Sequence, residues 1–179
     1  NVAWVWKEGL LSSLNRIQLW KLLQKQKQQI NGPELKNNED IVQLVGFVVG
    51  EEEYAIPILN IQEIIKPIEY TRVPSVPDYV LGVFNLRGNV IPLIDLRKRF
   101  SLNVTKQSPS TRYIVMKDAD NIAGFVIDRL TEAIRIDRNR IDPPPETLVK
   151  DKGMIYGIGK RDQNILTILK VESLLKRDF

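Results

Sequence analysis

The stretch YAIPILNIQEII at residues 54–65 decides the fold, because a similar stretch, AGFVIDRLTEAI, follows at residues 123–134. The two stretches align without gaps, and the alignment places Glu63 opposite Glu132. Both are rich in apolar and β-branched residues, which is typical of strands. The sequence therefore indicates a β-rich unit that occurs twice.

A second pair of matching stretches follows the first pair in the same order. GVFNLRGNVIPLIDL at residues 82–96 aligns with GIGKRDQNILTILKV at residues 157–171, and Asn89 is then opposite Asn164. Two ordered matches predict a duplication. We expect two similar β units with a seam between them, where a partner can bind.

Charged tips and short apolar runs predict antiparallel hairpins over most of the chain. Residues 50–53 and 117–121 are polar or charged, and each lies between two apolar runs. Three short helices are expected, at residues 77–85, 96–100 and 172–177. Asp95 directly precedes the second of these and is predicted to be its N-cap, a structural role that requires no catalysis.

The first forty residues differ in character from the remainder. Residues 9–30 contain no proline and space their apolar residues as a helix does, whereas residues 34–40 are polar and resemble a linker. The sequence thus predicts an N-terminal extension over residues 1–40, helical and then linker-like, followed by the main domain over residues 41–179.

The composition excludes several classes of protein. The chain has no cysteine and no histidine, so disulfides, thiolate or imidazole metal sites and Cys- or His-dependent catalysis are excluded. No apolar run approaches the roughly twenty residues of a membrane helix. The net charge of +4 is a weak indication of an anionic partner. We expect no cofactor, no metal and no membrane insertion.

Two other functions have weaker support from the residues. Glu63, Asp95 and Asp128 could form a hydrolytic carboxylate site, but their spacing does not force any two of them together. A small β-barrel that binds single-stranded nucleic acid is the main alternative. Aromatic residues make up 7% of the chain, and all three tryptophans precede the predicted strands, which disfavours such a base-stacking surface.

Three stretches resemble the CheW family of chemotaxis coupling proteins: YAIPILNIQEI, YVLGVFNLRGNVIPLIDLRKRF and ILTILKVESLL. The resemblance runs from about Ile41 to Phe179. It implies a mostly β fold of two packed SH3-like, five-stranded barrels. It also implies a non-enzymatic adaptor that joins the regulatory domain of the histidine kinase CheA to the tips of methyl-accepting chemotaxis receptors. Such a protein is cytoplasmic, associates with membrane receptor arrays and binds no nucleic acid.

The resemblance also implies a receptor-binding groove between the barrels. The expected groove residues are Glu63, Gly82, Val83, Asn85, Leu86 and Arg87. The planar fork of an arginine can bind carboxylates or terminal carbonyls of a partner helix. Val83 and Leu86 are candidate apolar anchors, and Gly82 either admits the helix or merely shapes a turn. The kinase is expected on the first barrel, at residues that the sequence does not identify.

Overall fold

The computed structural model describes residues 40–104, 106–146, 153–161 and 164–176, and these form a mostly β structure. The expected helix at residues 9–30 and most of the linker lie outside the described residues. Sheet A, the six-stranded sheet, has in spatial order β8 (Arg129–Asp137), β1 (Ile41–Val49), β2 (Glu52–Pro57), β11 (Asn164–Leu169), β10 (Ile155–Arg161) and β9 (Ile141–Asp142). Sheet B, the five-stranded sheet, has β3 (Ile61–Ile65), β6 (Arg112–Asp118), β7 (Asn121–Ile127), β5 (Asn89–Asp95) and β4 (Val80–Leu86).

The strand pairing repeats between the two sheets, as expected for the predicted duplication. The hairpin β1–β2 corresponds to β6–β7, and β4–β5 corresponds to β10–β11. The parallel pairings among the described strands also correspond, because β5 pairs with β7 in sheet B as β11 pairs with β2 in sheet A. Leu93 lies opposite Gly124 in the first of these, and Ile168 lies opposite Ala55 in the second. The sequence alignment relates these two pairs to each other.

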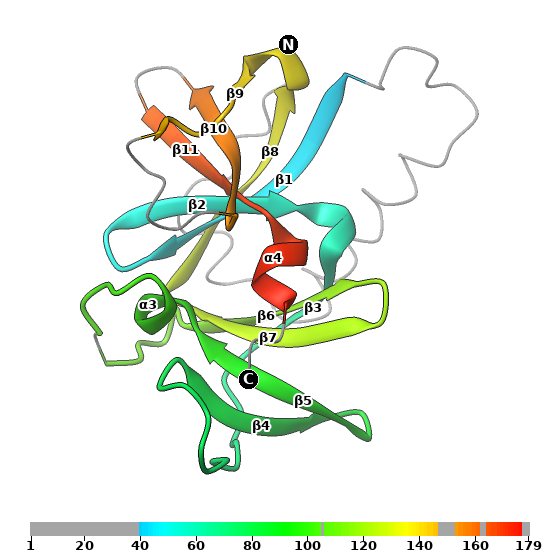
Figure 1. Ribbon diagram of the computed structural model, residues 1–179, viewed down its shortest axis with the longest axis vertical. Helices are drawn as coiled ribbons and strands as arrows, with labels where there is room; N and C mark the ends of the chain where they lie inside the picture. Colours follow the sequence, from blue (N-terminus) through cyan, green and yellow to red (C-terminus); the bar gives the residue numbers. More distant parts are fainter. Residues whose placement is uncertain (1–39, 105, 147–152, 162–163, 177–179) are drawn as a thin grey trace.

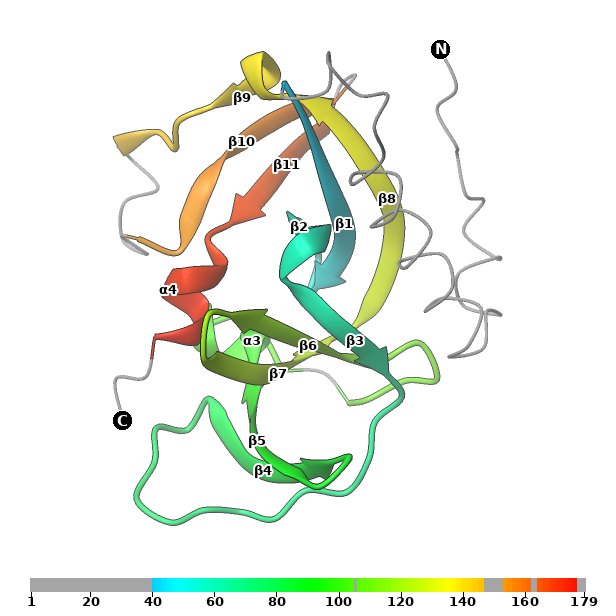
Figure 2. The ribbon, with the colours of Figure 1, turned by 90° about the vertical axis from the view of Figure 1, so that its right-hand side faces the viewer.

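Each half of the chain contributes strands to both sheets. After β2 the chain passes through the short 3-10 helix η1 (Ile58–Asn60) into β3, which pairs with β6 of the second half. After β7 the chain passes Asp128 into β8, which pairs with β1 of the first half. Figures 1 and 2 show these two crossings between the sheets. The two halves are therefore intertwined, and neither sheet is built from one half alone.

Both sheets curl, but neither is closed by its own strands. Every strand of sheet B contributes to one buried cluster, which includes Ile65, Phe84, Leu93, Tyr113 and Val126, and this requires the sheet to bend around it. Within the described residues, the two outermost strands of each sheet are not hydrogen-bonded to each other. Of the two five-stranded barrels that were expected, the structure thus shows two sheets that are not closed: sheet B has five strands, and sheet A has six, including the two-residue strand β9.

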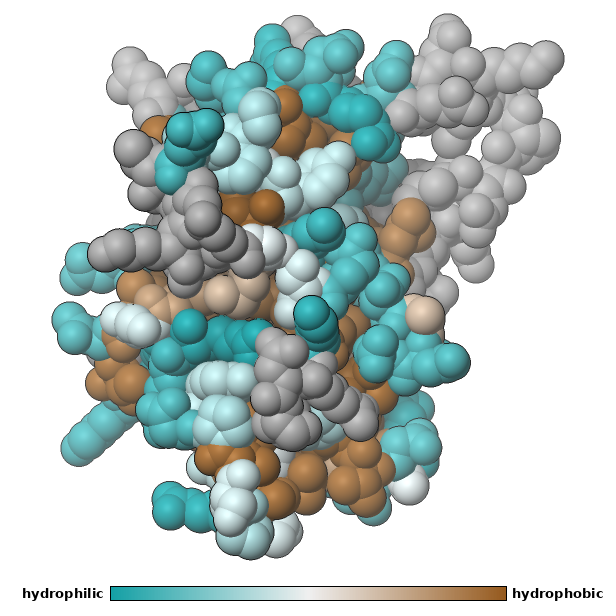
Figure 3. All heavy atoms as spheres, in the orientation of Figure 1, coloured by the Kyte–Doolittle hydropathy of each residue, from teal (hydrophilic) through white to brown (hydrophobic). Residues whose placement is uncertain are grey.

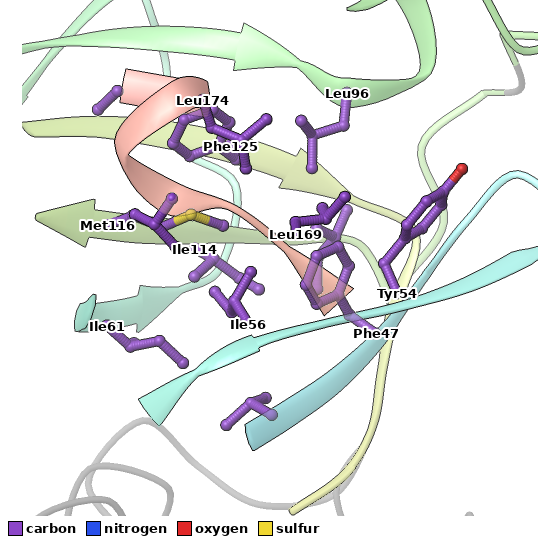
Figure 4. Packing of buried hydrophobic residues seen from close by; sticks show 14 of the residues in the cluster. Phe47, Tyr54, Ile56, Ile61, Leu96, Ile114, Met116, Phe125, Leu169 and Leu174 are labelled. Carbon is purple, nitrogen blue, oxygen red and sulfur yellow. The ribbon is translucent and has the colours of Figure 1, made fainter. Parts of the chain in front are cut away.

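One short helix follows the last long strand of each half. α3 (Leu96–Arg99) begins after Asp95, whose side chain accepts a hydrogen bond from the Arg97 backbone N–H and confirms the predicted cap. α4 (Val171–Leu175) places its apolar residues in the largest buried cluster, between the two sheets. Figure 4 shows Leu174 in this cluster beside Phe125. The packing of both sheets thus depends on α4.

The predicted helix at residues 77–85 is wrong, since most of this stretch forms strand β4. The residues of β4 alternate between buried and more exposed positions, as expected for a strand with one face on the core. Pro74 and Pro77 belong to the loop that leads into β4.

Candidate partner-binding site

The tight turn between β4 and β5 presents Arg87 at the surface. Leu86 and Asn89 are paired, so Arg87 and Gly88 form a two-residue loop with φ angles of 54° and 86°. Positive φ at both positions is the requirement of a type I′ hairpin turn. The Asn85 side-chain Oδ1 accepts a hydrogen bond of 2.9 Å from the Gly88 N–H and holds the turn. Asn85 thus positions Arg87.

The Arg87 guanidinium forms a two-point ion pair with the predicted neighbour Glu63. Its Nε lies 3.2 Å from Glu63 Oε2, and its Nη2 lies 3.1 Å from Oε1. The Arg87 side chain is 68% exposed, whereas that of Glu63 is 8% exposed. The hydrogen bond and the charge of Glu63 together raise the pKa of Arg87. A buried carboxylate therefore orients an exposed cation.

This ion pair joins the two edges of sheet B. Glu63 lies on β3 and Arg87 follows β4, and these are the outermost strands of the sheet. The curl of the sheet brings residues from opposite edges within hydrogen-bonding distance. The family resemblance placed Glu63 close to the groove residue Arg87, and the shape of this sheet brings the two side chains into contact.

Gly82 is required by the chain itself. Its φ is 150°, and a Cβ built there would lie 2.1 Å from the backbone oxygen of Thr71. Thr71 and Val83 exchange two backbone hydrogen bonds of 2.8 Å beside this point. Gly157, the aligned glycine of the second half, is similarly close to the backbone of Asp142. The space that Gly82 leaves open is thus occupied by a neighbouring segment of the same chain, so a direct approach of a partner there is not supported.

The two predicted apolar anchors face opposite sides of β4. Leu86 is 7% exposed and packs in the core of sheet B, so the expectation that it offers a surface anchor is not met. Val83 is partly exposed on the outer face, next to its pairing partner Pro92 on β5. Val90, opposite Asn85, is 69% exposed on the same face. Figure 3 shows apolar side chains over this end of the molecule.

A buried charge network, which the sequence did not predict, lies at the other end of β5. The Arg97 Nη2 lies 3.1 Å from Asp95 Oδ2, and its Nη1 lies 3.3 Å from Asp128 Oδ1. The second Asp128 oxygen accepts a hydrogen bond of 2.6 Å from the Gly50 N–H. Asp95 and Asp128 are therefore brought together, but a guanidinium lies between them, and Glu63 belongs to a separate site. This arrangement pairs both carboxylates with the Arg97 guanidinium and gives no support to a hydrolytic role.

The described residues contain neither an acidic metal-binding cluster nor a membrane-spanning helix. Within the described ranges, no three or more acidic side chains are grouped so as to hold a metal ion. The described helices are also too short to span a lipid bilayer.

The surface around Arg87 has three features of a contact site for another molecule. These are an oriented cation, a rigid turn and an apolar strip formed by Val83, Pro92 and Val90.

Comparison with known proteins gives this site its context. Residues 43–179 match the family model for the CheW-like domain. The chain belongs to the CheW family. The chemotaxis protein CheW of Helicobacter pylori is 58% identical over 162 residues, which cover 90% of this chain and 98% of that protein. The CheW of Bacillus subtilis is 34% identical over 146 residues, which cover 81% of this chain and 92% of that protein.

A solved structure of this family has the same fold. The scaffolding protein TtCheW from Thermoanaerobacter tengcongensis superimposes with a TM-score of 0.71 and is 34% identical. The match covers 76% of this chain and 94% of that structure. CheW membership, rather than the geometry of one site, identifies the role of the chain as that of a chemotaxis adaptor.

Proposed function

We propose that this chain is a non-enzymatic adaptor that binds the regulatory domain of the histidine kinase CheA and the helical tips of methyl-accepting chemotaxis receptors. The observation that carries the proposal is the exposed Arg87, oriented by the buried Glu63, in a chain of the CheW family. The protein would act in the cytoplasm, within receptor arrays. None of the relatives described above favours the alternative of a nucleic-acid binder.

The conformation of Arg87 supports a role for its side chain. A residue other than glycine at φ 54° is uncommon, and type I′ turns prefer asparagine or glycine. An arginine at this position costs some backbone free energy, so its guanidinium is the property that explains its presence. Nε and Nη2 are used by Glu63, and the exposed guanidinium has further N–H groups that can donate to carboxylates or carbonyls of a receptor helix.

The apolar strip beside Arg87 supplies the second element of the proposed site. Val83, Pro92 and Val90 share the outer face of the β4–β5 hairpin. A helix that binds a shallow apolar surface uses residues on one of its faces, and a charged rim fixes its register. In this arrangement, Asn85 and Gly82 shape the hairpin, Leu86 anchors it to the core, and Arg87 and Val83 contact the receptor.

The two halves differ at this position, which supports a single receptor site on sheet B. The residue that aligns with Arg87 in the second half is Asp162, and Glu132 aligns with Glu63. Two carboxylates cannot form the ion pair that orients Arg87. We further propose that each curled sheet, with its short helix, is one of the two SH3-like barrel units of the family over residues 41–179, and that the kinase binds the first of them.

The test is a titration of a helical receptor-tip peptide with the wild-type protein and with Arg87→Glu. We expect at least a tenfold loss of affinity, because the variant places like charges at the contact, while binding of the kinase regulatory domain is retained. Arg135→Glu is the matched control, since Arg135 is exposed on β8 in the other sheet and undergoes the same change of charge. Equal affinity of wild type and Arg87→Glu for the peptide would refute the site.

The double variant Glu63→Arg, Arg87→Glu separates recognition from structure. It restores an ion pair between the edges of sheet B but leaves no arginine at the turn. If Arg87 binds the receptor directly, the double variant remains defective. Full recovery of peptide binding would show instead that the ion pair acts only through the shape of the sheet.

A further inference from the structure

The Arg97 network lies where the chain crosses from sheet B into sheet A. Arg97 and Asp95 belong to the end of sheet B, because α3 continues directly from β5. Asp128 is the residue between β7 of sheet B and β8 of sheet A. Its side chain binds Gly50 in the β1–β2 hairpin of sheet A, and its backbone N–H donates to Val48 on β1. One guanidinium therefore connects the two sheets through Asp128.

The network is buried and charged. The side chains of Arg97, Asp95 and Asp128 are 5%, 3% and 21% exposed. Burial alone lowers the pKa of Arg97, but the hydrogen bond to Asp95 and the two carboxylate charges outweigh it, so the pKa is raised. Charges in such a location are screened little by salt and interact more strongly than surface charges.

The other crossing has no equivalent network in the sequence. The residues that align with Asp95, Arg97 and Asp128 are Lys170, Glu172 and Leu59. Leu59 is 65% exposed at the crossing from β2 to β3, so a charge network of this kind has no acceptor there. The two crossings are related by the duplication but differ in how they are held.

We propose that Arg97 is a clasp that fixes the angle between the two sheets by binding Asp95 on one side and Asp128 on the other. The planar fork of arginine is needed because it presents two nitrogens to Asp95 and a third to Asp128, which a lysine ammonium cannot do in one position. The central apolar cluster supplies adhesion between the sheets, but apolar contacts are not directional. The ion pairs of Arg97 are directional, so they fix the angle between the sheets.

The clasp also connects to the proposed receptor site through one strand. Arg87 is separated from β5 by Gly88 alone, and Asp95 is the last residue of β5. A force that a bound helix exerts on Arg87 would be transmitted along the seven residues of β5 to Asp95. From Asp95 it would pass through Arg97 to sheet A. This consequence rests on the proposed function, whereas the clasp itself does not.

The experiment measures the distance between the sheets without any partner. Because the chain has no cysteine, Val90→Cys on β5 and Ile165→Cys on β11 allow two spin labels to be placed unambiguously. Both side chains are exposed, at 69% and 68%, and the repeat relates them. Pulsed electron paramagnetic resonance then gives the distance distribution in the full chain. We expect one narrow distribution, which Arg97→Lys broadens or displaces.

Arg99→Lys is the matched control, because Arg99 is on the same helix and stacks on Tyr79 without an ion pair to either carboxylate. It should leave the distance distribution unchanged. Asp128→Asn is the second test, since its amide oxygen still accepts from Gly50 but its charge is lost, and it decides the question if Arg97→Lys fails to fold. Folded variants at Arg97 or Asp128 with the wild-type distribution would overturn the clasp, and their failure leaves the receptor titration unaffected.

Discussion

The helices α3 and α4 occupy aligned positions in the two halves, yet different interactions hold them. α3 buries an arginine between two carboxylates, whereas α4 buries Val171, Leu174 and Leu175 between the sheets. The residues before them, Asp95 and Lys170, have nearly the same backbone angles, but only Asp95 caps its helix with its side chain. Both helices place apolar residues in the central cluster, Leu96 in the case of α3, but only α3 adds buried ion pairs.

The largest predicted effect is the loss of the ion network at α3. Arg97→Ala leaves Asp95 and Asp128 close together without their cation, and breaking a buried ion pair in this way costs about 3–5 kcal/mol. Urea unfolding followed by circular dichroism measures this loss. Arg99→Ala should cost less, because a cation–π contact contributes only about 0.5–2 kcal/mol. Equal losses from the two variants would contradict the distinction between these arginines.

The core contact of α4 is predicted to come second. Leu174 is 1% exposed in the central cluster, and Leu174→Ala should lower the free energy of unfolding by about 2–5 kcal/mol through lost burial and a cavity. Glu172→Ala on the exposed face of the same helix should change stability by less than about 0.5 kcal/mol. Thermal or urea unfolding of both variants tests the difference. A small effect of Leu174→Ala would mean that α4 is not part of the cooperative core.

The smallest effect is a gain that makes the two helices more alike. Lys170→Asp gives α4 the capping residue that α3 has, and the backbone is already in the required extended conformation. We expect stability to rise by about 1 kcal/mol, with the carboxylate also favourable at the helix N-terminus. Lys176→Asp at the opposite end should give no gain. A loss of stability in Lys170→Asp would show that the lysine has a role that the structure does not reveal.

Much of the fold was predictable because the repeated stretches and the turns are visible directly in the sequence. The hairpin tips at residues 50–53 and 117–121, the cap at Asp95 and the short helices after β5 and β11 all depend on nearby residues. The pairing of β3 with β6 and of β8 with β1, which brings the two halves together in each sheet, was not predictable from these signals. A strand has the same pattern of burial whichever sheet it joins, so only tertiary packing decides its partner.

Part of the candidate site was predictable from the resemblance to the CheW family. The resemblance brought Glu63 and Arg87 together, and the structure places them in an ion pair. The burial of Leu86 and the backbone contact at Gly82 depend on the course of β4, which was expected to be a helix. The stretch Leu96–Arg99 contains three basic residues in succession, and no local pattern shows that Arg97 is the buried one. Its partner Asp128 is distant in sequence.

The pairing of strands from the two halves also determines how the chain would respond to cleavage. A nick in the connection between α3 and β6 would leave β1 and β3 on one fragment and their partners β8 and β6 on the other. Each piece alone would expose unsatisfied strand edges, so the pieces should reassociate and complement one another. A single ancestral copy of the repeat would also have had unsatisfied strand edges. Two such copies could have satisfied them by exchanging strands in a homodimer before gene fusion joined the copies.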